Sequence, residues 1–363
     1  MGRINVLVVD DSVVIRRLVT TVLDEDPDIT VVGTAASGRI AINKLAQVAP
    51  DCVTLDMEMP DLDGLGTLRE LRRTHPRLPV IIFSTLTERG AGATLDALAL
   101  GANDYVCKPA NVGSVPEAIA SVRQQLVPKI KALCPPAPGS APAALRRVPS
   151  VPLPAGAVAP TGRIDVLTIG SSTGGPDALT SVLPQLPASY PVPVVIVQHM
   201  PPVFTRMFAQ RLDSKCALSV KEAEHGDLVV PGRVLIAPGD KHLELKRVGT
   251  SVVAQLTSAP PENFCRPAVD VLFRSVAQVY GGSALAVVLT GMGSDGARGA
   301  EVLRRAGAEV VAQDEATSVV WGMPGAVVGA GLAHRVLPLG RVAADMVGVA
   351  ARARASALVG ARR

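Results

Sequence analysis

The sequence predicts two α/β domains, each built on a mainly parallel sheet and joined by a linker. Strand-length apolar runs alternate with helical periodicity along most of the 363 residues. Aromatic residues make up only 2% of the chain while hydrophobic residues make up 48%, so the cores are aliphatic, as in parallel sheets covered on both faces. One stretch, Cys134–Gly162, is rich in Pro and Ala and has no helix or strand period. We therefore expect domains at 1–130 and 163–355, separated by a Pro/Ala-rich linker at 131–162.

The first domain shows strand and helix signals in alternation. After the first apolar run, Ser12 can cap a helix that carries Val14, Leu18 and Val22 at four-residue spacing, and the last helix starts near Pro116. Strands are expected at Ile4–Val9, Thr30–Val32, Cys52–Leu55, Val80–Phe83 and Tyr105–Cys107. Five β-then-α units predict an open, flavodoxin-like parallel sheet with helices on both faces.

The second domain repeats this pattern and predicts a doubly wound, mainly parallel sheet. Strands are expected at Val166–Ile169, Val194–Val197, Ala284–Leu289 and Glu309–Ala312. Helices are expected at Pro202–Leu212, Pro267–Val279 and Gly296–Arg305. The middle stretch, Leu228–Thr257, holds short β-like pieces interrupted by Pro-Gly turns, and it predicts an antiparallel hairpin extension.

Composition excludes several classes of function. Lys and Arg number 36 against 32 Asp and Glu, with no long basic run, and the few aromatic residues offer no platform for base stacking, so we expect no nucleic-acid partner. The five cysteines are scattered without a CxxC pair, which argues against a disulfide framework or a zinc site and favours a reducing compartment. Neither a signal peptide nor an apolar stretch of membrane-spanning length is present. We expect a cytoplasmic monomer with no membrane insertion.

Carboxylates and a lysine follow the strands of the first domain. Asp10 and Asp11 follow the first strand, Asp56 the third, Ser84 the fourth and Lys108 the fifth. Ligands of open α/β sheets bind at these carboxyl ends of the strands. Carboxylates that converge there repel one another unless a cation such as Mg²⁺ is bound. A carboxylate beside Mg²⁺ and a fixed lysine can attack a phosphoryl group. The alternative is that each of these residues only caps a helix or begins a turn.

Residues 3–126 resemble the receiver domain of two-component response regulators, through the motifs VVDDS, LDMEMPDLDG and YVCKP. The resemblance implies that Asp56 accepts the phosphoryl group from a histidine kinase. It implies that Mg²⁺ is held by the carboxylates of Asp10, Asp11 and Asp56 and by the backbone carbonyl of Glu58. It also assigns the switch pair and the phosphate-sensing lysine to Ser84, Tyr105 and Lys108.

A candidate nucleophile follows the first strand of the second domain. Residues 170–174, GSSTG, fit G-x-S-x-G, a strand-to-helix elbow that exposes one serine at the edge of a sheet. The helix that follows supplies backbone amides for an oxyanion. A phosphate-cradling loop is a poor alternative because neither glycine-rich nucleotide motif is present; a plain helix cap is the other alternative.

A serine nucleophile needs a base that is itself oriented by an acid. His199 directly follows a strand of the same sheet, whereas we expect solvated loop positions for His225, His242 and His334. Asp295 also stands at a strand end and can orient the imidazole, a role compatible with capping the helix after it. The chain order Ser172, His199, Asp295 differs from that of α/β-hydrolases.

The phrases GSSTGGP, VQHMPP, RPAVDVLF, LTGMGSDGA and VVWGMPGAV resemble the catalytic domain of the chemotaxis protein-glutamate methylesterases over residues 163–350. The resemblance implies hydrolysis of γ-glutamyl methyl esters on methyl-accepting chemotaxis receptors, with release of methanol, and deamidation of receptor glutamines. It makes Ser172, rather than Ser171, the nucleophile and places an oxyanion-hole amide at Met292, with no cofactor for the ester chemistry. Ser171 departs from the family, which commonly has a small apolar residue there, and we expect Trp321 to pack in the core.

The two resemblances together imply an esterase and amidase that phosphorylation of the receiver by a chemotaxis histidine kinase activates. A transcriptional regulator is a second hypothesis, but it requires a helix-turn-helix after the linker, and none is indicated. A phosphate sink with a degenerate output domain is a third, and it requires the loss of a triad residue. All three triad residues are present.

Overall fold

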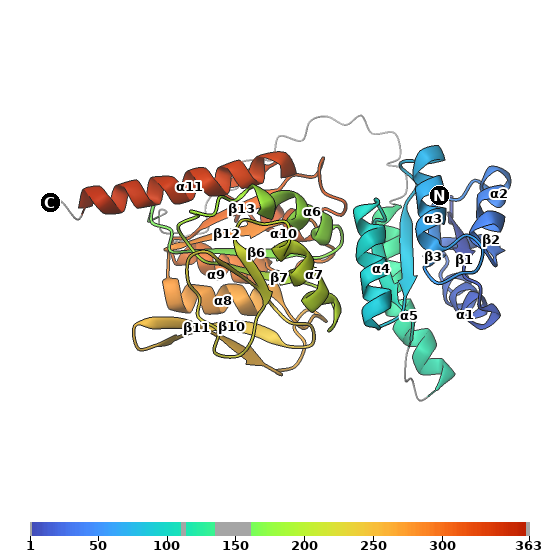
Figure 1. The fold of residues 1–363 in the computed structure, drawn as a ribbon, viewed down its shortest axis with the longest axis horizontal. Coiled ribbons are helices and arrows are strands. Elements are labelled where there is room, and N and C mark those ends of the chain that lie inside the picture. The colour runs from blue at the N-terminus through green and yellow to red at the C-terminus, as the bar shows by residue number, and fades with distance from the viewer. Residues whose placement is uncertain (1, 110–113, 135–160, 361–363) are drawn as a thin grey trace. The chain divides into compact units, whose positions relative to one another are not determined.

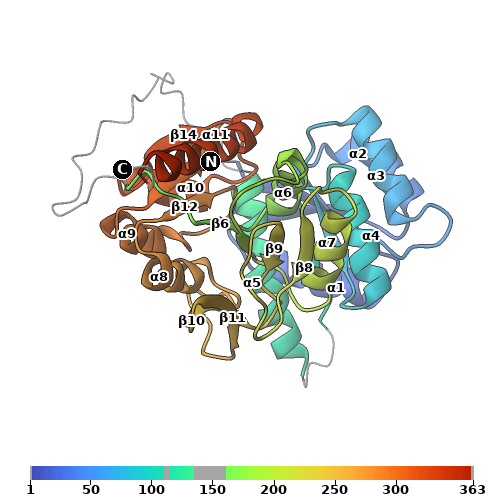
Figure 2. The same ribbon diagram turned by 60° about the vertical axis from the view of Figure 1, so that its left-hand side comes forward.

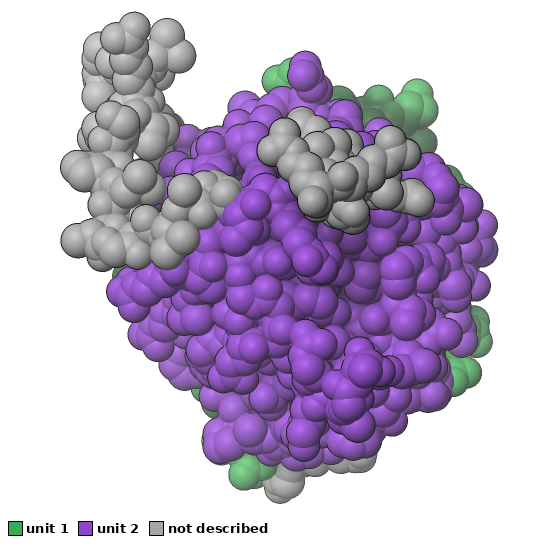
Figure 3. All heavy atoms as spheres, turned by 90° about the vertical axis from the view of Figure 1, so that its left-hand side faces the viewer, with its two compact units in different colours: residues 1–144 green, residues 145–363 purple. Residues whose placement is uncertain are grey.

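The computed structural model describes residues 2–109, 114–134 and 161–360, and it divides the chain into two units, residues 1–144 and 145–363 (Figures 1 and 3). Each unit holds a parallel sheet with helices along it, so the expected α/β class is confirmed. Residues 135–160 of the expected linker lie outside the described residues. None of the helices in the described residues combines the length and apolarity needed to cross a membrane.

Unit 1 contains a five-stranded parallel sheet. Its strands are β1 (Ile4–Val9), β2 (Ile29–Ala35), β3 (Cys52–Asp56), β4 (Val80–Ser84) and β5 (Asp104–Cys107). Its helices are α1 (Val13–Asp24), α2 (Gly38–Val48), α3 (Gly64–Thr74), α4 (Glu88–Ala99) and α5 (Val115–Leu133). The strand order is β2-β1-β3-β4-β5, with every pair parallel, which is the flavodoxin-like order.

The helices of unit 1 begin at residues whose side chains cap them. The Ser12 hydroxyl accepts a hydrogen bond from Ile15 N at the start of α1, and Ser114 does the same for Glu117 N at the start of α5. Helices α1 and α5 contact each other, as do α2 and α3, and α3 and α4. The core cluster is aliphatic apart from Phe83 and Cys52. Because the strands are parallel, their carboxyl ends lie at one edge of the sheet.

Unit 2 contains a seven-stranded sheet and a separate hairpin. Its strands are β6 (Val166–Ser171), β7 (Val194–Gln198), β8 (Ser219–Glu222), β9 (Arg233–Ile236), β10 (His242–Val248), β11 (Ser251–Thr257), β12 (Ala284–Val288), β13 (Glu309–Gln313) and β14 (Arg335–Leu337). Its helices are α6 (Gly175–Val182), the short 3₁₀ turn η1 (Leu183–Gln185), α7 (Phe204–Asp213), α8 (Val269–Tyr280), α9 (Ala297–Arg305), α10 (Gly322–Gly329) and α11 (Leu339–Gly360). The sheet order is β14-β13-β12-β6-β7-β9-β8.

The hairpin extension is confirmed, but it is shorter than the Leu228–Thr257 stretch. Strands β10 and β11 pair in antiparallel register from His242↔Thr257 to Val248↔Ser251. The preceding strand β9 instead joins the main sheet between β7 and β8, parallel to both, because its residues Val234, Leu235 and Ile236 are buried. Strands β8 and β14, at the two edges of the sheet, are too short to give a periodic signal in the sequence.

The sheet of unit 2 is covered on both faces. Helix α11 lies on one side of β12 and α8 on the other, and both views show the hairpin beside α8 (Figures 1 and 2). Leu243 and Leu245 from the hairpin share a buried cluster with Leu272 and Phe273 from α8. Strand β6 lies centrally, between β12 and β7. The loops that follow these three strands therefore meet at one edge of the sheet.

Candidate active site

Ser172 stands on a sharp turn between β6 and α6. Its backbone N–H donates to Thr290 O (3.0 Å) and its carbonyl accepts from Gly175 N (2.7 Å), so neighbouring loops fix the turn. Gly174 has φ +76°, a left-handed conformation that favours glycine at this point. At Gly291 a Cβ atom would lie 2.9 Å from the Ser172 Cβ, so only glycine lets that loop pack on the serine. Among the described residues, none forms a hydrogen bond with the Ser172 hydroxyl.

Ser171 has a different position. Its side chain is completely buried, and its hydroxyl donates to Gln198 Oε1 (2.7 Å). The Gln198 amide nitrogen in turn donates to the carbonyls of Ser172 (3.0 Å) and His199 (3.3 Å). The additional hydroxyl of Ser171 thus anchors the amide that holds both Ser172 and His199, and it is unavailable as a nucleophile.

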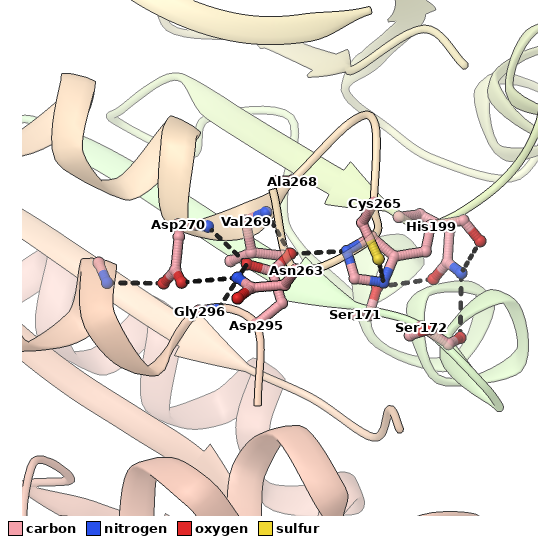
Figure 4. A network of polar contacts seen from close by, with 12 residues as sticks. Ser171, Ser172, His199, Asn263, Cys265, Ala268, Val269, Asp270, Asp295 and Gly296 are labelled. Atoms are coloured by element: carbon pink, nitrogen blue, oxygen red, sulfur yellow. Dashed lines mark hydrogen bonds and ion pairs between the residues drawn. The ribbon is translucent and has the colours of Figure 1, made fainter. Parts of the chain in front are cut away.

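His199 follows β7 and contacts Asp295, which follows β12 (Figure 4). His199 Nε2 lies 2.8 Å from Asp295 Oδ2, and the two side chains are 13% and 3% exposed. The His199 backbone N–H donates to Ser171 O, which fixes its distance from the serine turn. The structure therefore brings the three residues of the predicted triad together at one edge of the sheet. The pair of His199 and Asp295 is already formed.

Asp295 accepts hydrogen bonds from three backbone amides. Val269 N donates to Oδ2 (2.7 Å), and Asp270 N and Gly296 N donate to Oδ1 (3.0 Å each). The first two amides belong to the first turn of α8, so the carboxylate caps that helix. Burial alone would raise the pKa of Asp295, but the His199 partner and these amides outweigh burial and hold the pKa below its ordinary value. Asp295 is therefore ionised.

A second buried carboxylate lies beside Asp295. Asp270 Oδ1 accepts from Gly299 N (2.6 Å), and the Asn263 amide nitrogen donates both to Asp270 Oδ2 (2.9 Å) and to Asp295 Oδ1 (3.0 Å) (Figure 4). Burial, which is the largest cause, raises the pKa of Asp270 above its ordinary value. Asn263 thus joins two carboxylates that would otherwise repel each other.

A tight turn carries Asn263 to this position. Glu262 and Cys265 exchange two backbone hydrogen bonds, of 3.0 and 2.9 Å. The two central residues, Asn263 and Phe264, both have positive φ, 52° and 62°, as a type I′ turn requires. The Phe264 side chain is fully exposed, at 104%. Two adjacent non-glycine residues in this region store strain beside the site.

The same turn places a thiol against the histidine. Cys265 Sγ lies 3.6 Å from His199 Nδ1 (Figure 4). Burial alone would lower the pKa of His199, but its hydrogen bonds to Asp295 and Cys265 outweigh burial and raise the pKa above its ordinary value. The ring therefore lies between a carboxylate and a thiol, and both contacts favour its protonated form.

Sequence reasoning missed Gln198, Asn263, Cys265 and Asp270. One signal was available for Asp270: it is an acid among apolar residues in the helix-forming stretch VDVLF, where a buried charge needs a partner. Asn263 and Cys265 act through a turn whose backbone conformation no local pattern revealed.

The other histidines of unit 2 differ from expectation in two cases. His225 is exposed, as predicted. His242 is buried within β10, where its Nδ1 accepts from Ala268 N (3.2 Å), so the prediction of a solvated loop is wrong. His334 is half-buried and accepts from Val310 N (3.0 Å); burial, with the nearby Arg304 charge, lowers its pKa to about 4. Both rings satisfy backbone amides, which is why neither is solvated.

Met292 lies in the loop that packs on Ser172. Its neighbour Gly291 donates to Val320 O and accepts from Met323 N. No hydrogen bond from the Met292 amide to another described residue is found. Trp321 packs partly buried against the core and donates through its indole to Gln313 O (3.0 Å), so the expected packing role is confirmed.

In unit 1 the carboxylates and the lysine meet at the sheet edge. Lys108 Nζ lies 3.0 Å from Asp10 Oδ2 and 2.9 Å from Asp56 Oδ1. Burial raises the pKa of both carboxyl groups above their ordinary values, although Lys108 opposes this. Oxygen atoms of Asp10, Asp11 and Asp56 all lie within 4.8 Å of one another.

These residues fit a hard divalent cation. Asp56 Oδ2 is buried and has no hydrogen-bond partner among the described residues. An unpartnered buried oxygen of this kind is expected where a cation binds. The donor set is all oxygen, which Mg²⁺ prefers. Glu58 lies beside it, with its N–H donating to Asp56 Oδ1 (3.3 Å).

The side chains of Ser84 and Tyr105 contact residues other than Asp56. The Ser84 hydroxyl donates to Gly90 O (3.1 Å) and accepts from Thr94 Oγ1 (2.6 Å), both in α4. The Tyr105 ring is buried under Lys129 Nζ, 5.2 Å from its centroid. Their switch role stays a prediction.

Comparison with known proteins matches both units. The family described as Response regulator receiver domain matches residues 6–120, and the family described as CheB methylesterase matches residues 167–346. The crystal structure of the Thermotoga maritima CheB methylesterase catalytic domain is 46% identical with a TM-score of 0.51, covering 51% of this chain and 98% of that chain.

Full-length relatives match across both units. A protein-glutamate methylesterase/protein-glutamine glutaminase of Nocardioides sp. is 55% identical over 359 residues, 98% of each chain. A protein of the same name from Trichodesmium erythraeum is 50% identical, over 96% of this chain and 99% of that one. The chain therefore belongs to the protein-glutamate methylesterase/protein-glutamine glutaminase family, with a response-regulator receiver domain followed by a CheB methylesterase domain.

Proposed function

We propose that this chain hydrolyses γ-glutamyl methyl esters on methyl-accepting chemotaxis receptors, releasing methanol, and deamidates receptor glutamines, and that phosphorylation of Asp56 activates it. The observation that carries the proposal is the His199–Asp295 pair at 2.8 Å beside the Ser172 turn. Both reactions are acyl transfers, so one set of residues serves both.

The first half of the reaction acylates the serine. Asp295 holds Nε2–H of His199, which leaves Nδ1 as the nitrogen that takes the proton of the Ser172 hydroxyl. The serine oxygen attacks the γ-carbonyl carbon, and the carbonyl oxygen becomes an oxyanion to which the Met292 amide donates. Catalytic hydrogen bonds often form only with substrate bound, and here the Ser172 hydroxyl replaces the Cys265 thiol at Nδ1.

The second half releases products. The imidazolium gives its proton to the leaving methoxide, which departs as methanol, or to the leaving amino group of a glutamine, which departs as ammonia, and the γ-glutamyl group stays on Ser172 as an ester. His199 then takes a proton from water, which attacks the ester carbonyl. The bond between the acyl carbon and Ser172 Oγ breaks, His199 returns the proton to Oγ, and the glutamate carboxylate is released. The ionised Asp295 stabilises the imidazolium in both halves.

Asp56 is the proposed phosphoryl acceptor in the receiver unit. Asp10, Asp11, Asp56 and the Glu58 carbonyl would hold Mg²⁺, which neutralises charge on the phosphoryl oxygens when bound. Lys108, already beside Asp56 Oδ1, supplies a second positive charge. Ser84 would turn from α4 toward the phosphoryl group, with Tyr105 as its switch partner. A chemotaxis histidine kinase is the proposed donor.

The boundaries and setting of the enzyme complete the proposal. We place the receiver at 1–130, the linker at 131–162 and the esterase at 163–355. The five cysteines are free, which fits a reducing cytoplasm, and a monomer suffices because one chain supplies the whole triad. Phosphorylation activates by shifting the population toward an accessible Ser172 site.

The test follows methanol release from receptor membranes that carry labelled methyl esters, with and without a small-molecule phosphodonor. Ser172→Ala should abolish release, while Ser171→Ala should retain part of it, because Ser171 only anchors Gln198. Asp56→Asn should keep the basal rate and lose the response to phosphodonor. Release by Ser172→Ala at the wild-type rate would overturn the triad, and a wild-type response by Asp56→Asn would overturn the gating.

A further inference from the structure

We propose that Cys265 and His199 form a binding site for Zn²⁺, which reversibly occupies the catalytic base. Three potential ligand atoms, from His199, Cys265 and Asp295, lie within 4.8 Å of one another. Their positions in the sequence are far apart, so cysteine spacing could not reveal the site. A thiol and an imidazole suit zinc, whereas the oxygen cluster of unit 1 suits Mg²⁺.

The distance between the two inner ligands matches a zinc site. Zinc binds sulfur at about 2.3 Å and imidazole nitrogen at about 2.0–2.1 Å, so a tetrahedral angle places the two ligand atoms about 3.6 Å apart. Cys265 Sγ and His199 Nδ1 are 3.6 Å apart. The pair therefore needs little movement to accept the metal.

The outer contacts of the histidine also match. A zinc-bound histidine commonly donates its other ring N–H to a carboxylate, which fixes the tautomer and ring orientation. His199 Nε2 is paired with Asp295 Oδ2 at 2.8 Å. The oxygens of Asp295 are already occupied by backbone amides and Asn263. Asp295 therefore acts as the outer partner, not as a ligand.

The thiol is held in place before any metal arrives. Two backbone hydrogen bonds with Glu262 fix Cys265. The described residues give Sγ no hydrogen-bond partner except the imidazole. Arg274 forms a two-pronged ion pair with Glu262, at 2.7 and 2.6 Å, and anchors the turn to α8.

Binding replaces a proton with the metal. The Cys265 thiol loses its proton to solvent and the thiolate sulfur donates to Zn²⁺, while the lone pair of neutral His199 Nδ1 fills a second position and water fills the rest. The nitrogen that would take the Ser172 proton is then unavailable. Inhibition by zinc rests on the proposed function, but zinc binding does not.

The first experiment measures binding without activity. Full-length protein stripped with a chelator is titrated with Zn²⁺ against a chromogenic chelator, and with Co²⁺ to observe thiolate-to-metal charge-transfer absorption. Wild type and Cys216→Ala, a thiol outside the site, should each bind the zinc. Cys265→Ala should lose one equivalent and the Co²⁺ band, and Cys265→Ser, which preserves the side-chain size, should behave likewise. An unchanged stoichiometry and band in both Cys265 variants would overturn the proposal.

The second experiment measures methanol release in the presence of zinc. Zinc should inhibit wild type and Cys216→Ala, and half-inhibition of Cys265→Ala should need at least about tenfold more zinc. Mg²⁺ at the same concentrations should not inhibit. Equal zinc sensitivity of Cys265→Ala and wild type would overturn the inhibitory role. A wild type that binds zinc through Cys265 but releases no methanol would contradict the proposed function and leave the metal site standing.

Discussion

Asp295 accepts a 2.7 Å hydrogen bond from Val269 N. It thereby caps α8, the helix that precedes β12, rather than α9, the helix that follows Asp295. The Asp295 carboxylate is thereby tied to α8, and the N-cap of α9 is instead Gly296, which has positive φ. One carboxylate both orients His199 and satisfies amides that would otherwise be unpaired at a buried helix end.

Asp295→Asn should separate these two roles. The asparagine oxygen can still accept from the amides of α8, but its NH₂ group cannot accept from His199 Nε2–H, so the ring is held in the wrong tautomer. We expect kcat to fall by about 10⁴ and stability to fall by at most ~1–2 kcal/mol. Methanol release and thermal unfolding measure the two effects. Retention of kcat within tenfold would contradict the proposed orientation of the base.

The activity should depend on the protonation state of His199. Its pKa is raised by hydrogen bonds to Asp295 and Cys265 that outweigh burial, so the proton that catalysis must remove is held more tightly than in a free imidazole. We expect kcat/KM to rise with pH through a value above 6.5, measured with chelator present. Cys265→Ala removes one of the causes and should move this limb to lower pH.

Stability should show the matching sign. Because the folded pKa of His199 lies above 6.5, its contribution to the free energy of unfolding is complete below pH 6.5 and is lost as the pH rises through the folded value. His199→Gln should abolish that part of the pH dependence. In the pH profile of kcat/KM, an acidic limb that Cys265→Ala leaves unmoved would show that the thiol does not influence the pKa of His199.

Asn263 should position the acid. Asn263→Gly keeps the left-handed backbone and removes the amide that joins Asp270 to Asp295. We expect the free energy of unfolding to fall by about 1–3 kcal/mol and kcat to fall with little change in KM, because the Asn263 amide bonds the two carboxylates and so acts through Asp295. Asn263→Ala should be less stable still, by about 1 kcal/mol, since alanine strains at φ 52°. Equal stability of the two variants would show that the backbone conformation is not strained.

Asp56→Asn should stabilise the receiver unit when Mg²⁺ is absent. The raised pKa of Asp56 shows that the fold disfavours its charged form, chiefly through burial. Asparagine keeps an oxygen for Lys108 and replaces the unpartnered Oδ2 with a neutral group. We expect the melting temperature of the unit 1 transition to rise by a few degrees without Mg²⁺.

The same variant should respond less to the metal. Mg²⁺ should raise the melting temperature of wild type more than that of Asp56→Asn, because the variant has lost one anionic ligand. Glu70→Gln, which changes an exposed acid on α3, is a matched control that should behave as wild type. A wild type whose melting temperature ignores Mg²⁺ would contradict the metal site.

The sequence was sufficient for the architecture where strands are buried and helices are periodic. The central strands β3 and β7 are buried throughout and read as apolar runs in the sequence. The edge strands β8 and β14 could not be predicted, because each is short and partly exposed. Strand β9 was absorbed into the expected hairpin, because nothing local distinguishes a parallel partner from an antiparallel one.

The residues of the candidate site could be predicted where they follow strands, but not where they lie in turns. Ser172, His199 and Asp295 each follow a strand of one sheet, so topology alone brings them to one edge. Asn263 and Cys265 reach the same place through a turn whose two positive φ values no sequence pattern announced. His242 was misplaced because a histidine within a polar strand looks solvated until the loop at Ala268 covers it.

The long-range hydrogen bonds around Ser172 determine when the candidate site can first assemble during synthesis. Thr290 forms hydrogen bonds with Ser172 and with Thr173, of which Thr173 lies 117 residues earlier in the chain, and the partner of His199, Asp295, lies 96 residues later. A ribosome therefore exposes the serine and the histidine well before it makes the strand and loop that assemble them. A nascent chain therefore cannot form the His199–Asp295 pair, or the Thr290 bonds to the serine turn, until the segment that carries Thr290 and Asp295 has emerged.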